Sequence, residues 1–362
     1  MPAMTFEIKN VGQGRFLIPG LIDPHVHFRD PGFREKEDWA SGSAAALAGG
    51  VTLVLDMPNT NPPTTTVAAL EEKRVRAQAA SKVAFGLFFG ATTGEDGKLA
   101  NADEIRQAEG IVGIKVYMGS STGGLLVSDP AALEEIFTIA KEKDLPVVVH
   151  AENEEMIRAG KRDCECASVA TESALKLREK IGNRLHIAHL SCKGELELIR
   201  RYKKMDQHQR ISCEVTPHHL FFTEEEMKDG FLKVYPPLRS KEDVAALWEG
   251  LRDGTVDCLA TDHAPHTREE KQGPNPPAGV PGVEFLLPLM LNAVNEGKLT
   301  LEQLVVLTSE GPARIFKLKS RGSVLVDMNL VRTIDASMIR SKCGWSPYEG
   351  RTLKGWPVEA VV

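Results

Sequence analysis

Short runs of apolar and β-branched residues recur along the chain and alternate with segments in which apolar and polar positions mix. The runs are apolar throughout, which is typical of strands buried on both faces of a parallel sheet. The intervening segments, such as 130–143 and 193–204, have the pattern of helices. The predicted strands are eight in number and cover residues 20–28, 51–59, 83–91, 112–119, 145–152, 184–191, 210–220 and 256–265.

Eight strand–helix units within about 250 residues fit a closed α/β fold, the (β/α)8 TIM-type barrel. The alternative is an open doubly wound sheet, in which a glycine-rich phosphate-binding loop normally follows the first strand. Here the first predicted strand continues as GLIDPHVHFRDPG, residues 20–32, which lacks that pattern. We therefore favour the barrel.

The two ends of the chain do not follow the strand–helix pattern. We predict an N-terminal segment over 1–19, the barrel over 20–320, and a C-terminal segment over 321–362 that packs on the barrel. The last segment shows no clear strand alternation, so we expect it to be irregular. The termini are predicted to form only a small or degenerate β appendage.

Composition excludes several classes of function. The chain has 362 residues, of which 42% are hydrophobic and 26% charged, as in ordinary globular proteins. A net charge of −6 gives no broad basic surface for nucleic acid. There is no apolar run of about 18 residues that could span a membrane, and no signal-peptide pattern. The six cysteines do not resemble a disulfide framework, so we expect them to be reduced and the protein to be cytoplasmic.

Polar residues come late in strand after strand, which is where barrel enzymes place their chemistry. His25 and His27 are two apart on a predicted strand, so both side chains face the same way. Buried polar groups cost free energy unless something satisfies them, and one metal centre would satisfy several. Imidazole and carboxylate groups suit zinc. The residues in question are His25, His27, Asn59, Lys115, His150, His189 and Asp262.

Lys115 is unusual because it lies in the middle of an apolar strand, GIKVYMG. Five candidate protein ligands exceed the four that one zinc needs, which suggests two metals and a bridging group. Burial lowers the pKa of a lysine, and the neutral amine can add CO₂ to become an anionic carbamate. The alternative, that Lys115 extends its ammonium group past the strand end into solvent, stays open on spacing alone.

Several motifs together resemble the dihydroorotase family of the amidohydrolase superfamily, from about residue 19 to residue 350. Many members pair longer termini in a β-sandwich, which the short N-terminus here does not lead us to expect. The order of two histidines, a lysine, two histidines and an aspartate is the superfamily signature. The motifs FRDPG, MPNT and TDHAPHT narrow the resemblance from the superfamily to the dihydroorotase family. The matching segments are PGLIDPHVHFRDPG, MPNTNPP, GIKVYMG, VVVHAE, HIAHLS, CEVTPHHL, ATDHAPH and KCGWSPYEG.

The resemblance implies two Zn²⁺ ions per subunit, bridged by carbamylated Lys115 and a hydroxide. His25, His27 and Asp262 would hold one ion, and His150 and His189 the other. It further implies that Arg29, Asn59 and His266 bind the carboxylate of the substrate. The backbone near Ala278 and Gly279 would contact its ring, and the loop carrying Ser121 and Thr122 would close over it.

The reaction implied by the resemblance is the reversible hydrolysis of the cyclic amide of L-dihydroorotate to N-carbamoyl-L-aspartate, a step of pyrimidine biosynthesis. Asp262 would act as the catalytic proton shuttle. Members of the family are often homodimers, and some associate with aspartate transcarbamoylase. We expect a small-molecule substrate, and neither nucleic acid nor a membrane as partner.

Two other readings are weighed against this one. Dihydropyrimidinase, hydantoinase and allantoinase share the metal ligands, but dihydropyrimidinase substrates have no ring carboxylate to engage Arg29 and Asn59. A metal-free scaffold ranks third, because all six ligand positions are filled. Glu214, His218 and His219 could border the site or hold a third metal, and structural support is the favoured role.

Overall fold

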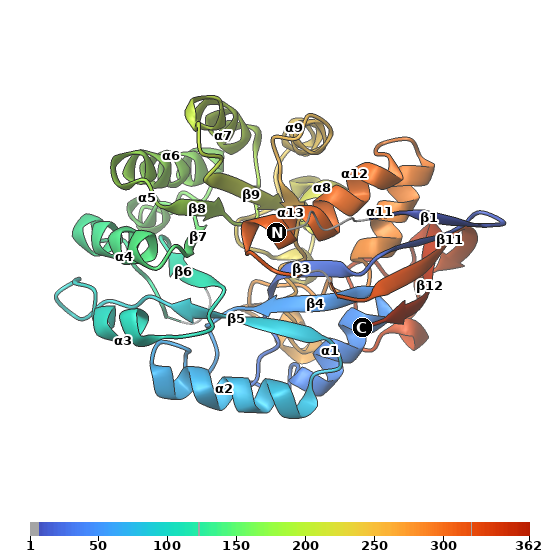
Figure 1. Ribbon diagram of the computed structural model, residues 1–362, viewed down its shortest axis with the longest axis horizontal. Helices are drawn as coiled ribbons and strands as arrows, with labels where there is room; N and C mark the ends of the chain where they lie inside the picture. Colours follow the sequence, from blue (N-terminus) through green and yellow to red (C-terminus); the bar gives the residue numbers. More distant parts are fainter. Residues whose placement is uncertain (1–6, 122–123, 320) are drawn as a thin grey trace.

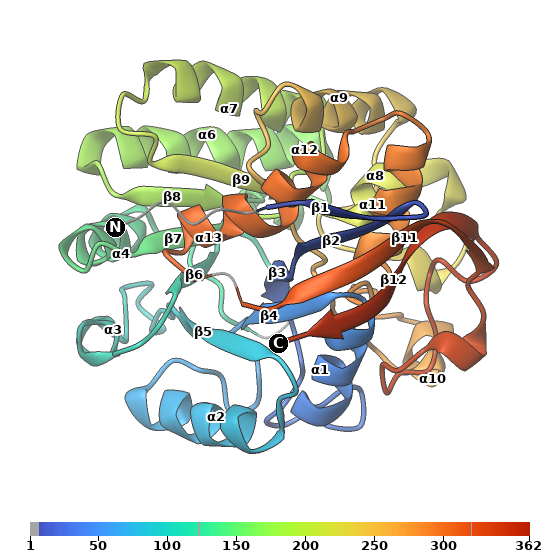
Figure 2. The same cartoon turned by 45° about the vertical axis from the view of Figure 1, so that its right-hand side comes forward.

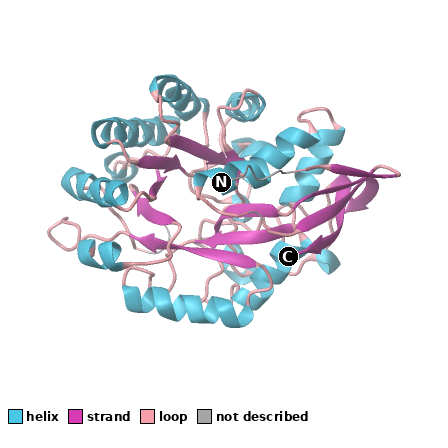
Figure 3. Cartoon of the chain, in the orientation of Figure 1, coloured by secondary structure: helices cyan, strands magenta, loops and turns pink. Residues whose placement is uncertain are grey.

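The chain folds around an eight-stranded parallel sheet that closes on itself, as seen in the computed structural model, which describes residues 7–121, 124–319 and 321–362. Figure 1 shows helices around the outside of the strands, and Figure 3 separates the two by colour. The strands follow chain order: β3 (Leu21–Val26), β4 (Val51–Asp56), β5 (Ala84–Gly90), β6 (Gly113–Tyr117), β7 (Pro146–His150), β8 (Arg184–Ile187), β9 (Ile211–Val215) and β10 (Cys258–Leu259). The predicted barrel is confirmed.

The barrel closes between its first and last strands. The backbone N–H of His27 donates to the carbonyl of His263, at 2.8 Å. The buried carboxylate of Asp23 accepts from the backbone N–H of Thr261 at 3.0 Å and from its hydroxyl at 2.5 Å. These bonds fix the end of β3, which carries His25, against the turn that carries Asp262.

Helices cover the outside of the barrel between successive strands. They begin at residues suited to capping; for example, Asp129 precedes Pro130 and accepts from the N–H groups of Ala131 and Ala132. The helices are α1 (Trp39–Ala48), α2 (Val67–Ala80), α3 (Ala102–Gln107), α4 (Pro130–Glu142), α5 (Glu154–Arg158), α6 (Cys164–Ile181), α7 (Lys193–Met205), α8 (Pro217–Phe221), α9 (Lys241–Arg252), α10 (Arg268–Gln272), α11 (Leu286–Asn295), α12 (Leu301–Val305) and α13 (Gly311–Ile315). Short turns of helix lie at η1 (Glu224–Glu226), η2 (Gly230–Leu232), η3 (Val306–Glu310) and η4 (Ala336–Met338).

The two termini share a four-stranded antiparallel sheet on one side of the barrel, as Figure 2 shows. Its order is β1 (Lys9–Gly12), β2 (Arg15–Pro19), β11 (Ser323–Thr333) and β12 (Thr352–Val361). The predicted β appendage is confirmed, but the expectation of an irregular C-terminal segment was wrong. Val324 and Val326 do alternate into the core, while the far half of β11 is exposed and carries no such pattern. The division at residues 19 and 320 stays a proposal.

The expectation of six reduced cysteines was also wrong. Cys164, at the start of α6, forms a disulfide with Cys192, which caps α7. Cys166, Cys213, Cys258 and Cys343 are free and buried. The spacing of Cys164 and Cys192 along the chain gives no sign that they pair. The disulfide forms because the starts of α6 and α7 meet in the folded barrel.

Reduction of this disulfide is expected to lower the free energy of unfolding. The two cysteines are 28 residues apart, and a cross-link of that span restricts the unfolded chain by about 3–4 kcal/mol. Urea denaturation with and without dithiothreitol measures the effect. The Cys164→Ser variant is the control, because reductant should not change its stability; equal stability of the reduced and oxidised wild type would contradict the prediction.

Candidate metal centre and substrate pocket

One cavity at the carboxyl ends of the barrel strands gathers nearly every residue predicted for the site. Six potential metal ligands meet there with two predicted substrate-binding side chains. His266 lies just behind the cavity wall, and Thr122 falls outside the described residues. The cavity is lined by His25, His27, Arg29, Asn59, Lys115, Tyr117, Ser121, His150, His189, Tyr235, Asp262, Ala264, Ala278 and Gly279.

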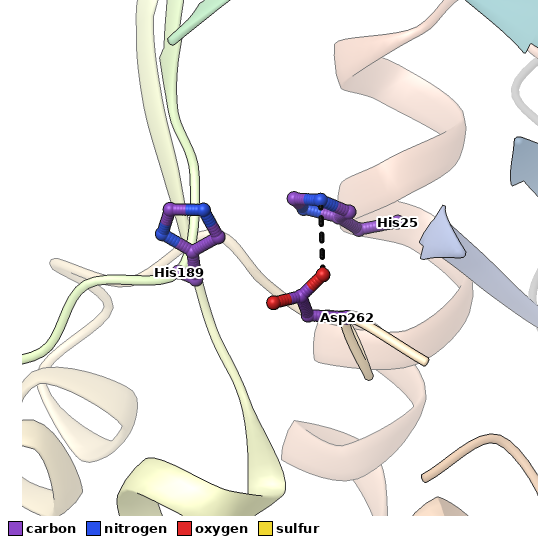
Figure 4. Close-up of side chains that lie close together, drawn as sticks. All are labelled: His25, His189 and Asp262. Carbon is purple, nitrogen blue, oxygen red and sulfur yellow. Dashed lines mark ion pairs between the residues drawn. The ribbon is translucent and has the colours of Figure 1, made fainter. Parts of the chain in front are cut away.

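Asp262 follows β10 and faces His25 and His27, at the end of β3, and His189, which follows β8. Its Oδ1 is 3.0 Å from Nε2 of His27 and 3.3 Å from Nε2 of His25. Figure 4 shows His25, His189 and Asp262 pointing toward one another, and one ligand atom from each lies within 4.8 Å of the others. Burial opposes the charge of Asp262, but the neighbouring histidines outweigh it and hold its pKa well below the usual range.

Three residues of the site have backbone dihedral angles outside the strand region. Arg29, His189 and Asp262 follow their strands with φ of 62°, 37° and 46°. Non-glycine residues seldom adopt this left-handed region, and it is concentrated at functional sites. The turn re-aims each side chain into the cavity as the chain leaves the barrel.

His150 and His189 form the second group of potential ligands. Nδ1 of His150 is 3.1 Å from Nε2 of His189, and Nε2 of His150 lies 2.7 Å from Glu152. Burial lowers the pKa of both imidazoles, so both are neutral near pH 7. With its Nε2–H donated to Glu152, His150 turns a lone pair toward its neighbour. Converging neutral nitrogens of this kind suit a metal ion.

Buried acceptors hold His25 and His27 in the same way. Nδ1 of His25 donates to Glu214 at 2.5 Å, and Nδ1 of His27 donates to the side-chain oxygen of Asn59 at 2.6 Å. Each bond leaves Nε2 to face Asp262. Burial, the largest influence, lowers the pKa of His27 to about 4. The sequence favoured structural support as the role of Glu214, and it did not indicate that Glu214 orients His25, a proposed metal ligand.

Lys115 is fully buried on β6 and contacts no acceptor among the described residues. Its Nζ lies 5.1 Å from the centre of the Tyr117 ring. Burial lowers the pKa of the amine to about 8, although Glu214 and Asp262 oppose the shift. An amine in this setting is readily deprotonated, and it is an unsatisfied polar group unless it is modified or bound.

Arg29 supplies a buried cation on the wall of the cavity. Its Nε donates to the carbonyl of Pro265 at 3.1 Å, and its Nη2 lies 3.2 Å from Nε2 of His266. His266 places Nε2 3.1 Å from the carbonyl of Ala278, and Nδ1 3.3 Å from the ammonium of Lys36. The tautomer protonated on Nε2 lets His266 donate to Ala278 and accept from Lys36, but it offers no lone pair to Nη2 of Arg29. Burial and the surrounding cations lower the pKa of His266 to about 2, so it is neutral.

Comparison with known proteins places the chain in a class of metal-dependent hydrolases. The Amidohydrolase family profile matches residues 16–326. The chain is 37% identical to a dihydroorotase of Methanosarcina mazei, covering 93% of this chain and 80% of that protein. It is 40% identical to the multifunctional protein CAD of Squalus acanthias, of which it spans only 14%.

Among solved structures, the L-hydantoinase (dihydropyrimidinase) of Arthrobacter aurescens superposes with a TM-score of 0.89 at 33% identity, covering 96% of this chain and 84% of that one. The chain belongs to the amidohydrolase family and, within that family, to the dihydroorotases. In the part of the chain that the structure describes, no helix is long and apolar enough to cross a membrane.

Proposed function

We propose that the chain is a zinc-dependent dihydroorotase, which interconverts L-dihydroorotate and N-carbamoyl-L-aspartate. The observation that carries the proposal is Arg29, a buried guanidinium on the wall of the cavity that holds the ligand group. A buried cation needs an anionic partner, and its planar fork matches a carboxylate. Dihydroorotate brings such a carboxylate beside its cyclic amide.

The donor set fits two zinc ions. His25, His27 and Asp262 would hold one, and His150 and His189 the other, with Lys115 as a carbamate between them. The support is the neutral state of His27, His150 and His189, the ionised Asp262 and the unpartnered amine of Lys115. When bound, a pair of zinc ions would activate water near neutral pH and polarise the amide carbonyl.

The protein's own groups would position the substrate and move the proton. Arg29 would bind the ring carboxylate together with Asn59 and His266, and the backbone at Ala278 and Gly279 would contact the ring. Water attacks the amide carbon, and the C–N bond breaks. Asp262 would take the proton from the attacking water and deliver it to the leaving ring nitrogen. The reverse sequence closes the ring.

A second candidate is a hydantoinase-type cyclic amidase. Its support is the 33% identity and TM-score of 0.89 with the L-hydantoinase of Arthrobacter aurescens. The two candidates share the metal ligands and differ in what Arg29 does. A substrate without a carboxylate would leave that guanidinium buried without an anionic partner, which is costly.

Replacement of Arg29 by methionine separates the candidates. We expect the KM for dihydroorotate to rise by about a hundredfold, which corresponds to roughly 2.7 kcal/mol of lost binding at 1.36 kcal/mol per tenfold. Zinc content should stay at the wild-type level, because the hydrogen bonds of Arg29 go to Pro265 and His266, and neither is a proposed metal ligand. Steady-state kinetics with metal analysis measures both quantities, and loss of zinc in parallel with activity would make Arg29 structural.

Partners and location are proposed on more general grounds. We propose a homodimer and a cytoplasmic location from the resemblance to dihydroorotases, because the Cys164–Cys192 disulfide removes the argument from six reduced cysteines. Association with aspartate transcarbamoylase is also retained; its support is the match to one part of a multifunctional protein.

A further inference from the structure

Arg162, between α5 and α6, contacts three segments of the chain that adjoin the cavity. Its Nε donates to both oxygens of Glu152, at 3.0 Å each, and its Nη2 donates to Glu152 at 2.5 Å. The same Nη2 donates to the backbone carbonyl of Ser120 at 2.7 Å. Cζ of the guanidinium lies over the Tyr235 ring, 3.3 Å from its centre.

Each of the three contacts leads into the site. Glu152 holds Nε2 of His150, and so sets which nitrogen of that imidazole faces His189. Ser120 directly precedes Ser121, and Tyr235 lines the cavity beside it. One side chain therefore fixes the orientation of a proposed zinc ligand and the position of the adjoining wall.

Arg162 is itself held firmly in place. Its carbonyl accepts from Nη1 of Arg239 at 2.8 Å, and Nε of Arg239 donates to the hydroxyl of Ser191 at 3.2 Å. Arg239 therefore links the segment of Arg162 to the segment of Ser191, and the Cys164–Cys192 disulfide connects the same two segments a second time. The side chain of Arg162 is 17% exposed, so little water screens its contacts.

We propose that Arg162 is a positioning residue with two separable roles. Through Glu152 it fixes His150 for zinc, and through Ser120 and Tyr235 it sets the wall that receives the substrate. The inference rests on the proposed function. Only arginine combines a planar fork for a carboxylate with a face that stacks on an aromatic ring, whereas lysine offers a compact charge alone.

Two variants and a control test the two roles. Arg162→Gln removes the charge beside Glu152, and Arg162→Lys keeps a charge but loses the stacked plane. Arg201→Gln is the control, because Arg201 also pairs with a carboxylate, Glu172, but on the exposed surface of α6 and α7. For each folded protein we would measure zinc retention against a chelator, and kcat and KM on the cyclic amide that the wild type hydrolyses.

We expect Arg162→Gln to weaken zinc retention and lower kcat by roughly 10–100-fold, as loss of a group behind a metal ligand does. Arg162→Lys should keep zinc retention within about threefold of wild type, while its KM rises about tenfold, or 1.4 kcal/mol. The inference would be overturned if the Arg162 variants matched Arg201→Gln in zinc retention and KM. It would also be overturned if zinc retention in Arg162→Lys fell by the same factor by which its KM rose.

Failure of this inference is distinguishable from failure of the proposed function. Zinc retention is measured without any substrate. The kinetic comparison uses whichever cyclic amide the wild type accepts, so a hydantoinase would still report the effect of Arg162.

Discussion

The Lys115→Ala variant is expected to lose zinc and to hydrolyse dihydroorotate at least roughly a thousandfold more slowly than the wild type, equivalent to about 4 kcal/mol at 1.36 kcal/mol per tenfold. The reason is that Lys115, as the proposed carbamate, would supply the anion between the two proposed sets of ligands. Without the carbamate, two cations would approach each other with no bridging charge between them.

Metal analysis and turnover measure the two losses, and short carboxylic acids provide the control. Acetate or propionate can enter the space left by the alanine side chain and supply a bridging carboxylate, so they should restore part of the activity. Full zinc content and full activity in Lys115→Ala would show that the lysine has no part in the site, and that its place in an apolar strand has another cause.

The Asp262→Asn variant is expected to fold and to lose turnover by roughly 10²–10⁴-fold, the range for removal of a general acid–base group. The side-chain amide of the variant cannot take up the proton of the attacking water. The substitution also removes the negative charge that faces Nε2 of both His25 and His27. Circular dichroism checks the fold, and single-turnover kinetics checks the proton transfer.

A matched control for this variant is Asp23→Asn. Asp23 is also a buried carboxylate at the junction of the first and last strands, but it bonds Thr261 and does not line the cavity. Its variant should lose stability more than turnover per folded molecule. If Asp262→Asn retained wild-type turnover, the proton-shuttle role would be refuted.

The positions of several site residues could be predicted from sequence because these residues lie on or directly after apolar strands, although the left-handed turns at Arg29, His189 and Asp262 are not described by strand periodicity. His25 and His27 are two apart on β3 and reach the cavity together. His150 ends β7 opposite Tyr117, and Lys115 lies two residues before Tyr117 on the neighbouring strand β6. A parallel barrel brings such ends to one face, so a list of late polar residues in apolar runs already describes the site.

The groups that orient those residues could not be predicted in the same way. Glu214 and Glu152 are ordinary acidic residues in sequence. Glu214, on β9, meets His25 only in the folded barrel, and Glu152, two residues after His150, meets Nε2 of that imidazole through the turn that follows β7. The Cys164–Cys192 pairing likewise depends on where two helices begin. Arg162 lies in a connecting segment with no periodic pattern, and only its contacts with Glu152, Ser120 and Tyr235 reveal it.

Turnover of the zinc-loaded wild type on L-dihydroorotate and on dihydrouracil, measured side by side, tests the central claim most directly. The two rings differ by the carboxylate that Arg29 is proposed to bind, so the account predicts a strong preference for dihydroorotate. Preference for dihydrouracil would contradict the assignment of Arg29 and favour the hydantoinase-type reading. No turnover of either substrate, with two zinc ions verified per chain, would contradict the account of the substrate altogether.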